Sequence, residues 1–145
     1  MKRWMGLLVT MLVLAGSCSS EAAAVRIAYD PGGRIGKYID RYERLRASGR
    51  DVMIDGFCAS ACTIVLATLP SNRICVTSRA ELAFHAAWDI GHRGQPVTNP
   101  GATRMIYSMY PGPVRRWIAQ RGGLTRRTIF LSGGPLQAMY RSCPV

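Results

Sequence analysis

Apolar residues gather in four short stretches of the chain, each bounded by polar or turn-forming residues. Stretches of this length predict β-strands, and here they cover 25–29, 52–54, 74–76 and 82–85. A sharp turn, Asp30-Pro31-Gly32-Gly33, follows the first of them.

Two helices are predicted between these strands. Apolar side chains recur every three or four residues at Ile35, Tyr38, Ile39, Tyr42 and Leu45, which predicts an amphipathic helix. Gly49 ends this helix. An apolar run over 62–69 predicts a buried helix that Pro70 ends. The order strand, helix, strand, helix, strand is typical of the α/β class with right-handed crossovers.

Beyond the fourth strand the periodic pattern weakens. Residues 91–101 are predicted to form a polar loop, and 102–110 and 114–120 to form helices. Gly122-Gly123 makes a break, with one or two short helices expected after it. The C-terminal part is therefore predicted to be mostly helical.

The N-terminal segment has the features of a signal peptide. Two basic residues follow Met1, and the apolar stretch over 5–16 is too short to span a bilayer. Ala22-Ala23-Ala24 has the small-x-small pattern of a cleavage site. We therefore expect a signal peptide over 1–24 and one domain over 25–145, which the length of 145 residues also favours. The protein is then periplasmic or secreted.

A second processing route competes with this cleavage. The segment Leu14-Ala15-Gly16-Ser17-Cys18 resembles a bacterial lipobox in which Cys18 is the lipidated residue. Membrane anchoring is expected only if Cys18 carries a lipid. Either route exports the protein.

Export changes the interpretation of the cysteines. Four of them follow the leader, at Cys58, Cys62, Cys75 and Cys143. An even number in an oxidising compartment predicts two disulfides among three connectivities, with buried free thiols as the alternative. Cys62 and Cys75 lie on a predicted helix and the strand after it, so we favour that pair, which leaves Cys58 with Cys143. A zinc site is disfavoured because Cys-x3-Cys is not followed by a second close pair, and we expect no metal.

The chain is basic, with a net charge of +11. Residues 90–145 hold eight Arg and no acidic residue, and the whole chain has two Lys against 17 Arg. This skew favours a solvated basic face over a dedicated anion site. Specific binding of nucleic acid is not expected, because no recognisable module interleaves aromatic with basic residues.

Three features carry candidate chemistry. Gly32-Gly33 lies between a strand and a helix, where its amides approach a ligand closely. Ser60 lies at a strand-to-helix turn between two alanines, as an exposed nucleophile requires, with the amide of Ala61 directed at an oxyanion. His85 ends a strand, where a general base projects from the sheet. Taken singly, each feature is more often structural: a simple turn, an N-cap and a packed histidine.

The order of these features resembles the Clp-type serine peptidases of the Clp/crotonase superfamily. The stretch 25–33 is similar to that family's strand and Pro-Gly-Gly loop, 57–61 to its nucleophile turn, and 73–85 to its strand pair ending in the catalytic His. The resemblance implies a βα superhelical fold, here truncated at the N-terminus. It also implies catalysis by Ser60 and His85, with an oxyanion hole at Gly33 and Ala61 beside Gly32.

The chain departs from the family at the third catalytic residue. Thr128 stands where the resemblance places an Asp, and no acid follows Asp89. Thr128 and Asp89 are the candidates for a third member, and slow catalysis by a Ser60–His85 dyad is expected.

The resemblance also bears on ligands and partners. It implies a peptide or acyl substrate, no cofactor and a homo-oligomer, while an exported protein meets no ATPase partner. The leading hypothesis is an exported serine hydrolase acting on short or unfolded peptides. The alternative is an inactive Clp-fold binding module that uses the same cleft or the Arg-rich C-terminal half.

Overall fold

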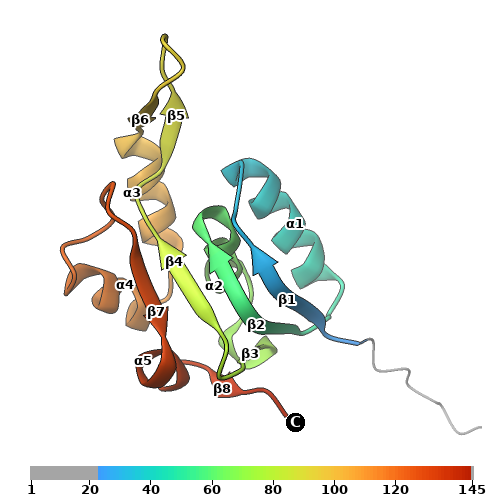
Figure 1. Cartoon of the computed structure of the whole chain (residues 1–145). Coiled ribbons are helices and arrows are strands. Elements are labelled where there is room, and N and C mark those ends of the chain that lie inside the picture. Colours follow the sequence, from blue (N-terminus) through green and yellow to red (C-terminus); the bar gives the residue numbers. More distant parts are fainter. Residues whose placement is uncertain (1–22, 145) are drawn as a thin grey trace, which may run out of the picture.

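The computed structural model describes residues 23–144 (Figure 1). The signal peptide expected over 1–24, apart from its last two residues, and the lipidation alternative at Cys18 lie outside the described residues. Among the helices of this part of the chain, none is long and apolar enough to cross a membrane.

A six-stranded sheet is built around one long strand, β2 (Val52–Ala59). One edge of β2 pairs in parallel with β1 (Val25–Asp30). The other edge is shared, because β3 (Ile74–Val76) pairs with its first half and β4 (Glu81–Phe84) with its second half, both in parallel. A strand with two successive neighbours along one edge curls the sheet, and the protein is of mixed α/β structure.

The last strands close the sheet at both ends. β7 (Ile129–Ser132) runs antiparallel beside β4, and β8 (Arg141–Ser142) runs parallel beside β3. A separate two-stranded hairpin, formed by β5 (Trp88–Ile90) and β6 (Pro96–Thr98), extends from the end of β4 (Figure 1).

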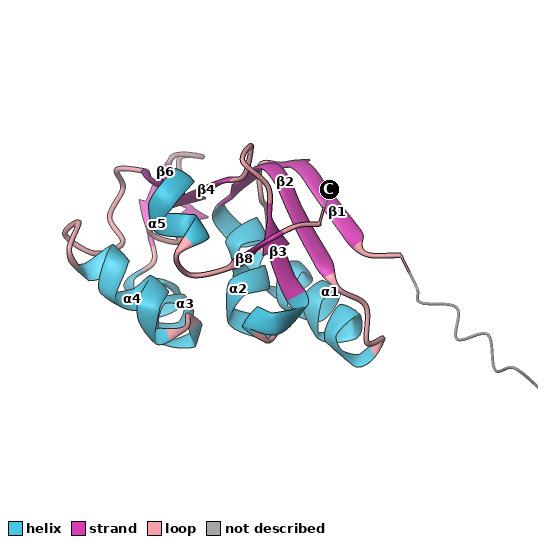
Figure 2. Cartoon of the chain, turned by 90° about the horizontal axis from the view of Figure 1, so that it is seen from below, coloured by secondary structure: helices cyan, strands magenta, loops and turns pink. Residues whose placement is uncertain are grey.

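Helices lie mainly along one face of the sheet (Figure 2). They are α1 (Ile35–Ala47), the 3-10 turn η1 (Ser60–Ile64), α2 (Val65–Thr68), α3 (Pro100–Met109) and α4 (Gly112–Ala119). Two further short elements are η2 (Ser71–Arg73), which leads from α2 into β3, and α5 (Gly133–Gln137), which joins β7 to β8. Tyr42 of α1, Leu82 of β4 and Ile118 of α4 are all fully buried, so one core joins the sheet to its helical cover.

Gly56 allows β1 and β2 to lie close together. The register of this pair shifts between Ile27 and Tyr29. A side chain at Gly56 would collide with the carbonyl oxygen of Ala28. A residue without Cβ is therefore required at this irregularity.

Two predictions about the C-terminal part are wrong. The loop expected over 91–101 contains β6, and a strand, β7, stands where a short helix was expected. In β7, Ile129 and Leu131 are buried while Phe130 and Ser132 are exposed. This alternation has the period of a strand, but four residues are too few to separate it from helical spacing.

Both disulfides form within the described residues, and the favoured pairing is wrong. Cys58 bonds Cys62, with their Cα atoms 5.3 Å apart, and Cys75 bonds Cys143, with Cα atoms 4.8 Å apart. The first bridge spans the turn from β2 into η1. The Cys75–Cys143 bond forms because β8, just before Cys143, pairs with β3. Next to it the Cys143 amide donates a hydrogen bond to the Val76 carbonyl.

Candidate active site

Ser60 occupies a left-handed backbone conformation at the turn from β2 into η1. Its φ is 55°, and no other non-glycine residue between 23 and 144 has a positive φ. A side chain in this region costs about 1–3 kcal/mol and persists only where the surroundings enforce it. A strained serine at a strand-to-helix turn is the backbone geometry of a nucleophile elbow.

The loop that contains Gly32 is packed directly against this turn. Gly32 has a φ of 86°, and an added Cβ would lie 2.7 Å from the Cβ of Ser60 and 2.9 Å from the nitrogen of Ala61. No other residue type fits here without displacing the serine. The structure thus brings together the Gly-Gly loop and the serine turn, which are separated by more than 25 residues in the chain.

The amides of Ala61, which follows Ser60, and of Gly33, which follows Gly32, are unpaired in the described part of the chain. Ala61 is the second residue of η1, where an N–H has no acceptor within the helix. Neither Ala61 nor Gly33 donates one of the backbone or side-chain hydrogen bonds found between residues 23 and 144 outside regular elements. A free N–H beside a serine, as at Ala61, is one of the donors that stabilisation of an oxyanion requires.

Asp30 holds the Gly-Gly loop in place. Its carboxylate accepts hydrogen bonds from the Gly32 amide at 2.9 Å, the Tyr38 hydroxyl at 2.5 Å and Arg41 at 3.1 Å. Burial and the hydrogen bond to Asp30 raise the pKa of Tyr38 to about 12. The hydrogen bonds of the Asp30 carboxylate therefore serve to hold the loop in place.

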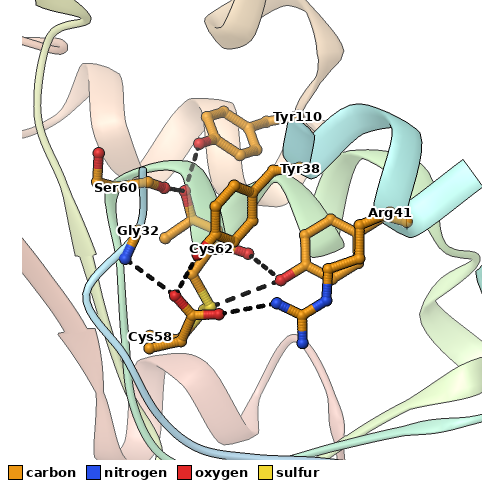
Figure 3. The surroundings of a disulfide bond; sticks show 10 residues. Gly32, Tyr38, Arg41, Cys58, Ser60, Cys62 and Tyr110 are labelled. Carbon is orange, nitrogen blue, oxygen red and sulfur yellow. Dashed lines mark hydrogen bonds and ion pairs between the residues drawn. A yellow bond between two sulfur atoms is a disulfide. The ribbon is translucent and has the colours of Figure 1, made fainter. Parts of the chain in front are cut away.

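The Cys58–Cys62 bond brackets the serine turn (Figure 3). The hydroxyl of Tyr42 donates to the Cys62 carbonyl at 3.0 Å and lies 3.6 Å from its Sγ. In Figure 3 the hydroxyl of Ser60 points away from the disulfide. The disulfide therefore stabilises the turn on the side opposite to the Ser60 hydroxyl and does not block that hydroxyl.

A second contact holds the carbonyl of Ser60. The hydroxyl of Thr63 donates to it at 2.7 Å and lies 2.6 Å from the hydroxyl of Tyr110, the residue that follows α3 (Figure 3). Since the Ser60 carbonyl is held and its Oγ makes no hydrogen bond within the described residues, the turn leaves the hydroxyl available for reaction.

His85 follows β4 directly and shares a small cavity with Ser60. This cavity of about 30 Å³ is lined by both residues and by Ala61. Space on this scale holds about one water molecule. Between residues 23 and 144 no hydrogen bond joins the Ser60 hydroxyl to His85.

The imidazole of His85 is oriented by a backbone carbonyl. Its Nδ1 lies 2.8 Å from the carbonyl oxygen of Ala86. A carbonyl only accepts, so Nδ1 carries the proton and Nε2 of the neutral ring is left as the acceptor. This is the tautomer that a general base needs.

No carboxylate of the described residues contacts His85. Asp89 lies on the exposed hairpin and accepts a hydrogen bond from the Asn99 amide at 2.7 Å. Asp55 is buried in a network with Arg26, Thr77 and Arg79. Thr128 lines a second cavity together with His85. Of the candidates for a third member, only Thr128 is placed beside the histidine.

This second cavity was not anticipated from the sequence. It measures about 510 Å³, within the range of small-ligand sites of about 300–1,000 Å³. Besides His85 and Thr128, it is lined by Trp88 and Ile90 of β5, Pro96 of β6, and Arg126. We call it the hairpin groove. The apolar residues of β5 were the signal available in the sequence, but nothing local showed that the segment before β7 lies beside them.

Comparisons with known proteins do not identify the chain: neither a protein-family model nor a curated protein matches it.

Proposed function

We propose that this protein is an exported serine hydrolase of the Clp/crotonase type, acting on short or unfolded peptides or on related acyl compounds. The observation that carries the proposal is the strained backbone of Ser60, packed against Gly32 and sharing a cavity with His85. A curled sheet with parallel strands on both edges of β2 is compatible with that fold. Two disulfides fit an oxidising compartment and so favour export.

In the proposed reaction, the Oγ of Ser60 attacks the acyl carbon while Nε2 of His85 takes its proton. The amides of Gly33 and Ala61 donate to the developing oxyanion. The leaving group departs with the proton from His85, and water then hydrolyses the acyl-enzyme by the same route. Because Ser60 and His85 are not hydrogen-bonded without substrate, the contact must tighten when substrate binds.

The missing carboxylate sets the expected rate. The Ala86 carbonyl orients the imidazole but, being neutral, stabilises its charged form less than a carboxylate does. Activity about 10³- to 10⁴-fold below that of a complete triad is therefore expected. No ATPase partner is needed for substrates that are already unfolded.

The test is labelling of the protein with a fluorophosphonate probe. We expect slow labelling of the wild type and none of Ser60→Ala. Thr128→Asp should label faster, because it places a carboxylate beside His85. Thr125→Asp is the matched control, since it adds the same charge to the same segment at a position that does not line the groove.

An inactive binding module is the second candidate function, favoured by the lack of a carboxylate at His85. If the wild type never labels and Thr128→Asp restores nothing, the hydrolase proposal fails and the binding module takes its place.

A further inference from the structure

The hairpin groove offers an apolar surface next to His85. Trp88 is 54% exposed and Ile90 is 73% exposed, and both line the groove. Every residue of β5 and β6 is exposed, so the hairpin contributes no side chain to the core. Large apolar residues clustered on such an element indicate a surface that a ligand covers.

The same groove contains an unneutralised positive charge. Arg126 lines it, and no ion pair between residues 23 and 144 includes this guanidinium. Asp89, the only acid on the hairpin, is bonded to Asn99 instead. Since no acid follows Asp89 in the sequence, residues 90–145 supply no acidic side chain as a counter-charge. A guanidinium in this setting is complementary to a carboxylate.

Unpaired strand edges adjoin the groove. β7, which follows Arg126 and Thr128, pairs only with β4, and the β5–β6 hairpin pairs with no further strand of the described residues. Open edges of this kind accept an extended peptide through main-chain hydrogen bonds. The groove thus offers an apolar surface, a cation and open strand edges. These are complementary to a ligand that has an apolar side chain, a carboxylate and a peptide backbone.

We infer that the hairpin groove binds the C-terminal end of a short peptide, with the terminal carboxylate on Arg126 and an apolar side chain on Trp88 and Ile90. The inference rests on the proposed function, because His85 lines this groove as well as the cavity that it shares with Ser60. Substrates would then be apolar peptides cleaved near their free C-terminus. In this proposal, Arg126, one of the arginines of the basic C-terminal part, binds the carboxylate of the peptide.

Calorimetric binding of two probes tests the inference without requiring any turnover. N-acetyl-alanyl-leucine and its C-terminal amide differ only in the carboxylate. We expect the acid to bind the wild-type protein about tenfold more tightly than the amide, because a charge-assisted hydrogen bond is lost in the amide. In Arg126→Gln the two probes should bind alike. In Arg127→Gln, the matched control at the next position, which does not line the groove, the tenfold difference should remain.

A further variant separates the apolar contact from the charge. Trp88→Ala should weaken the binding of both probes by a similar factor and leave the ratio of their affinities unchanged. Equal affinity of acid and amide for the wild type, no binding of either probe, or the same loss in Arg127→Gln as in Arg126→Gln would each overturn the inference. Because probe binding does not depend on Ser60 and fluorophosphonate labelling does not depend on Arg126, failure of the groove and failure of the hydrolase are distinguished.

Discussion

Ser60 is held in an unfavourable backbone conformation that no hydrogen bond of its own hydroxyl compensates. Its neighbours enforce the conformation instead: Gly32 packs on its Cβ, Thr63 donates to its carbonyl, and the Cys58–Cys62 bond closes the turn. Strain retained at one serine is typical of a site kept for reaction at some cost in stability.

Replacing Ser60 by glycine should therefore stabilise the protein. Glycine adopts positive φ without the steric cost of a Cβ. We expect the free energy of unfolding of Ser60→Gly to exceed that of Ser60→Ala by about 1 kcal/mol, while both variants lose labelling. Urea denaturation measures the difference. Equal stability of the two variants would show that the turn is not strained.

Asp55 makes the stability of the fold depend on pH. Its buried carboxylate accepts hydrogen bonds from Arg79 at 2.6 Å, Thr77 at 2.8 Å and Arg26 at 2.6 Å. These bonds, first that from Arg79, hold the pKa of Asp55 far below its ordinary value of 3.8. A lowered pKa in the folded state means that the stabilisation is complete above the unfolded pKa and is lost as the pH falls toward the folded one.

Asp55→Asn should accordingly be less stable than the wild type at neutral pH. The difference in free energy of unfolding should shrink as the pH falls below about 4, where the unfolded carboxylate takes up its proton. Denaturation at a series of pH values measures it. Asp40→Asn on the exposed face of α1 is the control, and a gap between wild type and Asp55→Asn that is independent of pH would contradict the assignment.

Strands and helices could be predicted where a local pattern was long enough to have a period. The periodic apolar residues of α1 and the apolar runs of the first four strands identified these elements, and the small residues around Ser60 identified the serine turn. β7 and β8 could not be found in this way, because neither is a continuous buried apolar run like β3 or most of β4, and each exists through pairing with β4 or β3. Cys143 is brought to Cys75 by the pairing of β8 with β3, so this disulfide could not be predicted from the sequence for the same reason.

The two disulfides should contribute unequally to stability. Cys58–Cys62 joins residues four apart, whereas Cys75–Cys143 joins residues 68 apart. Restriction of the unfolded chain predicts about 2 kcal/mol for the short bridge and about 4 kcal/mol for the long one. Replacing each pair by alanines and measuring the free energy of unfolding tests this.

Loss of the two disulfides should affect fluorophosphonate labelling in the opposite order to stability. The pair at Cys58 and Cys62 braces the serine turn, so its removal should reduce fluorophosphonate labelling more than removal of the more stabilising pair. Labelling that instead follows overall stability in the two variants would argue against a specific role for the short bridge.

Across the chain, stability should differ sharply between the sheet and the hairpin. β2 and β4 lie in the core, while β5 and β6 are exposed along their whole length and, among the strands of residues 23–144, pair only with each other. Two-stranded hairpins without an apolar cover are marginally stable. The element that forms one side of the groove is therefore the one most easily displaced.

Amide hydrogen exchange should show this contrast. We expect amides of β5 and β6 to exchange orders of magnitude faster than those of β2, because local opening of the hairpin exposes no core residue. Mass spectrometry of peptic fragments measures both rates. Equal protection of the hairpin and β2 would mean that the hairpin is covered in solution.

The long bridge also imposes an order on oxidative folding. If the chain is exported as proposed and enters an oxidising compartment from its N-terminus, Cys58 and Cys62 arrive together and their turn can close at once. Cys75 follows 13 residues after Cys62, yet its partner is a further 68 residues along the chain. Until Cys143 emerges, the Cys75 thiol is exposed to exchange with the bridge already formed, and a Cys62–Cys75 bond is the closest wrong product in the chain. Maturation of this protein should thus depend on disulfide isomerisation as well as oxidation, a demand set entirely by where β8 rejoins the sheet.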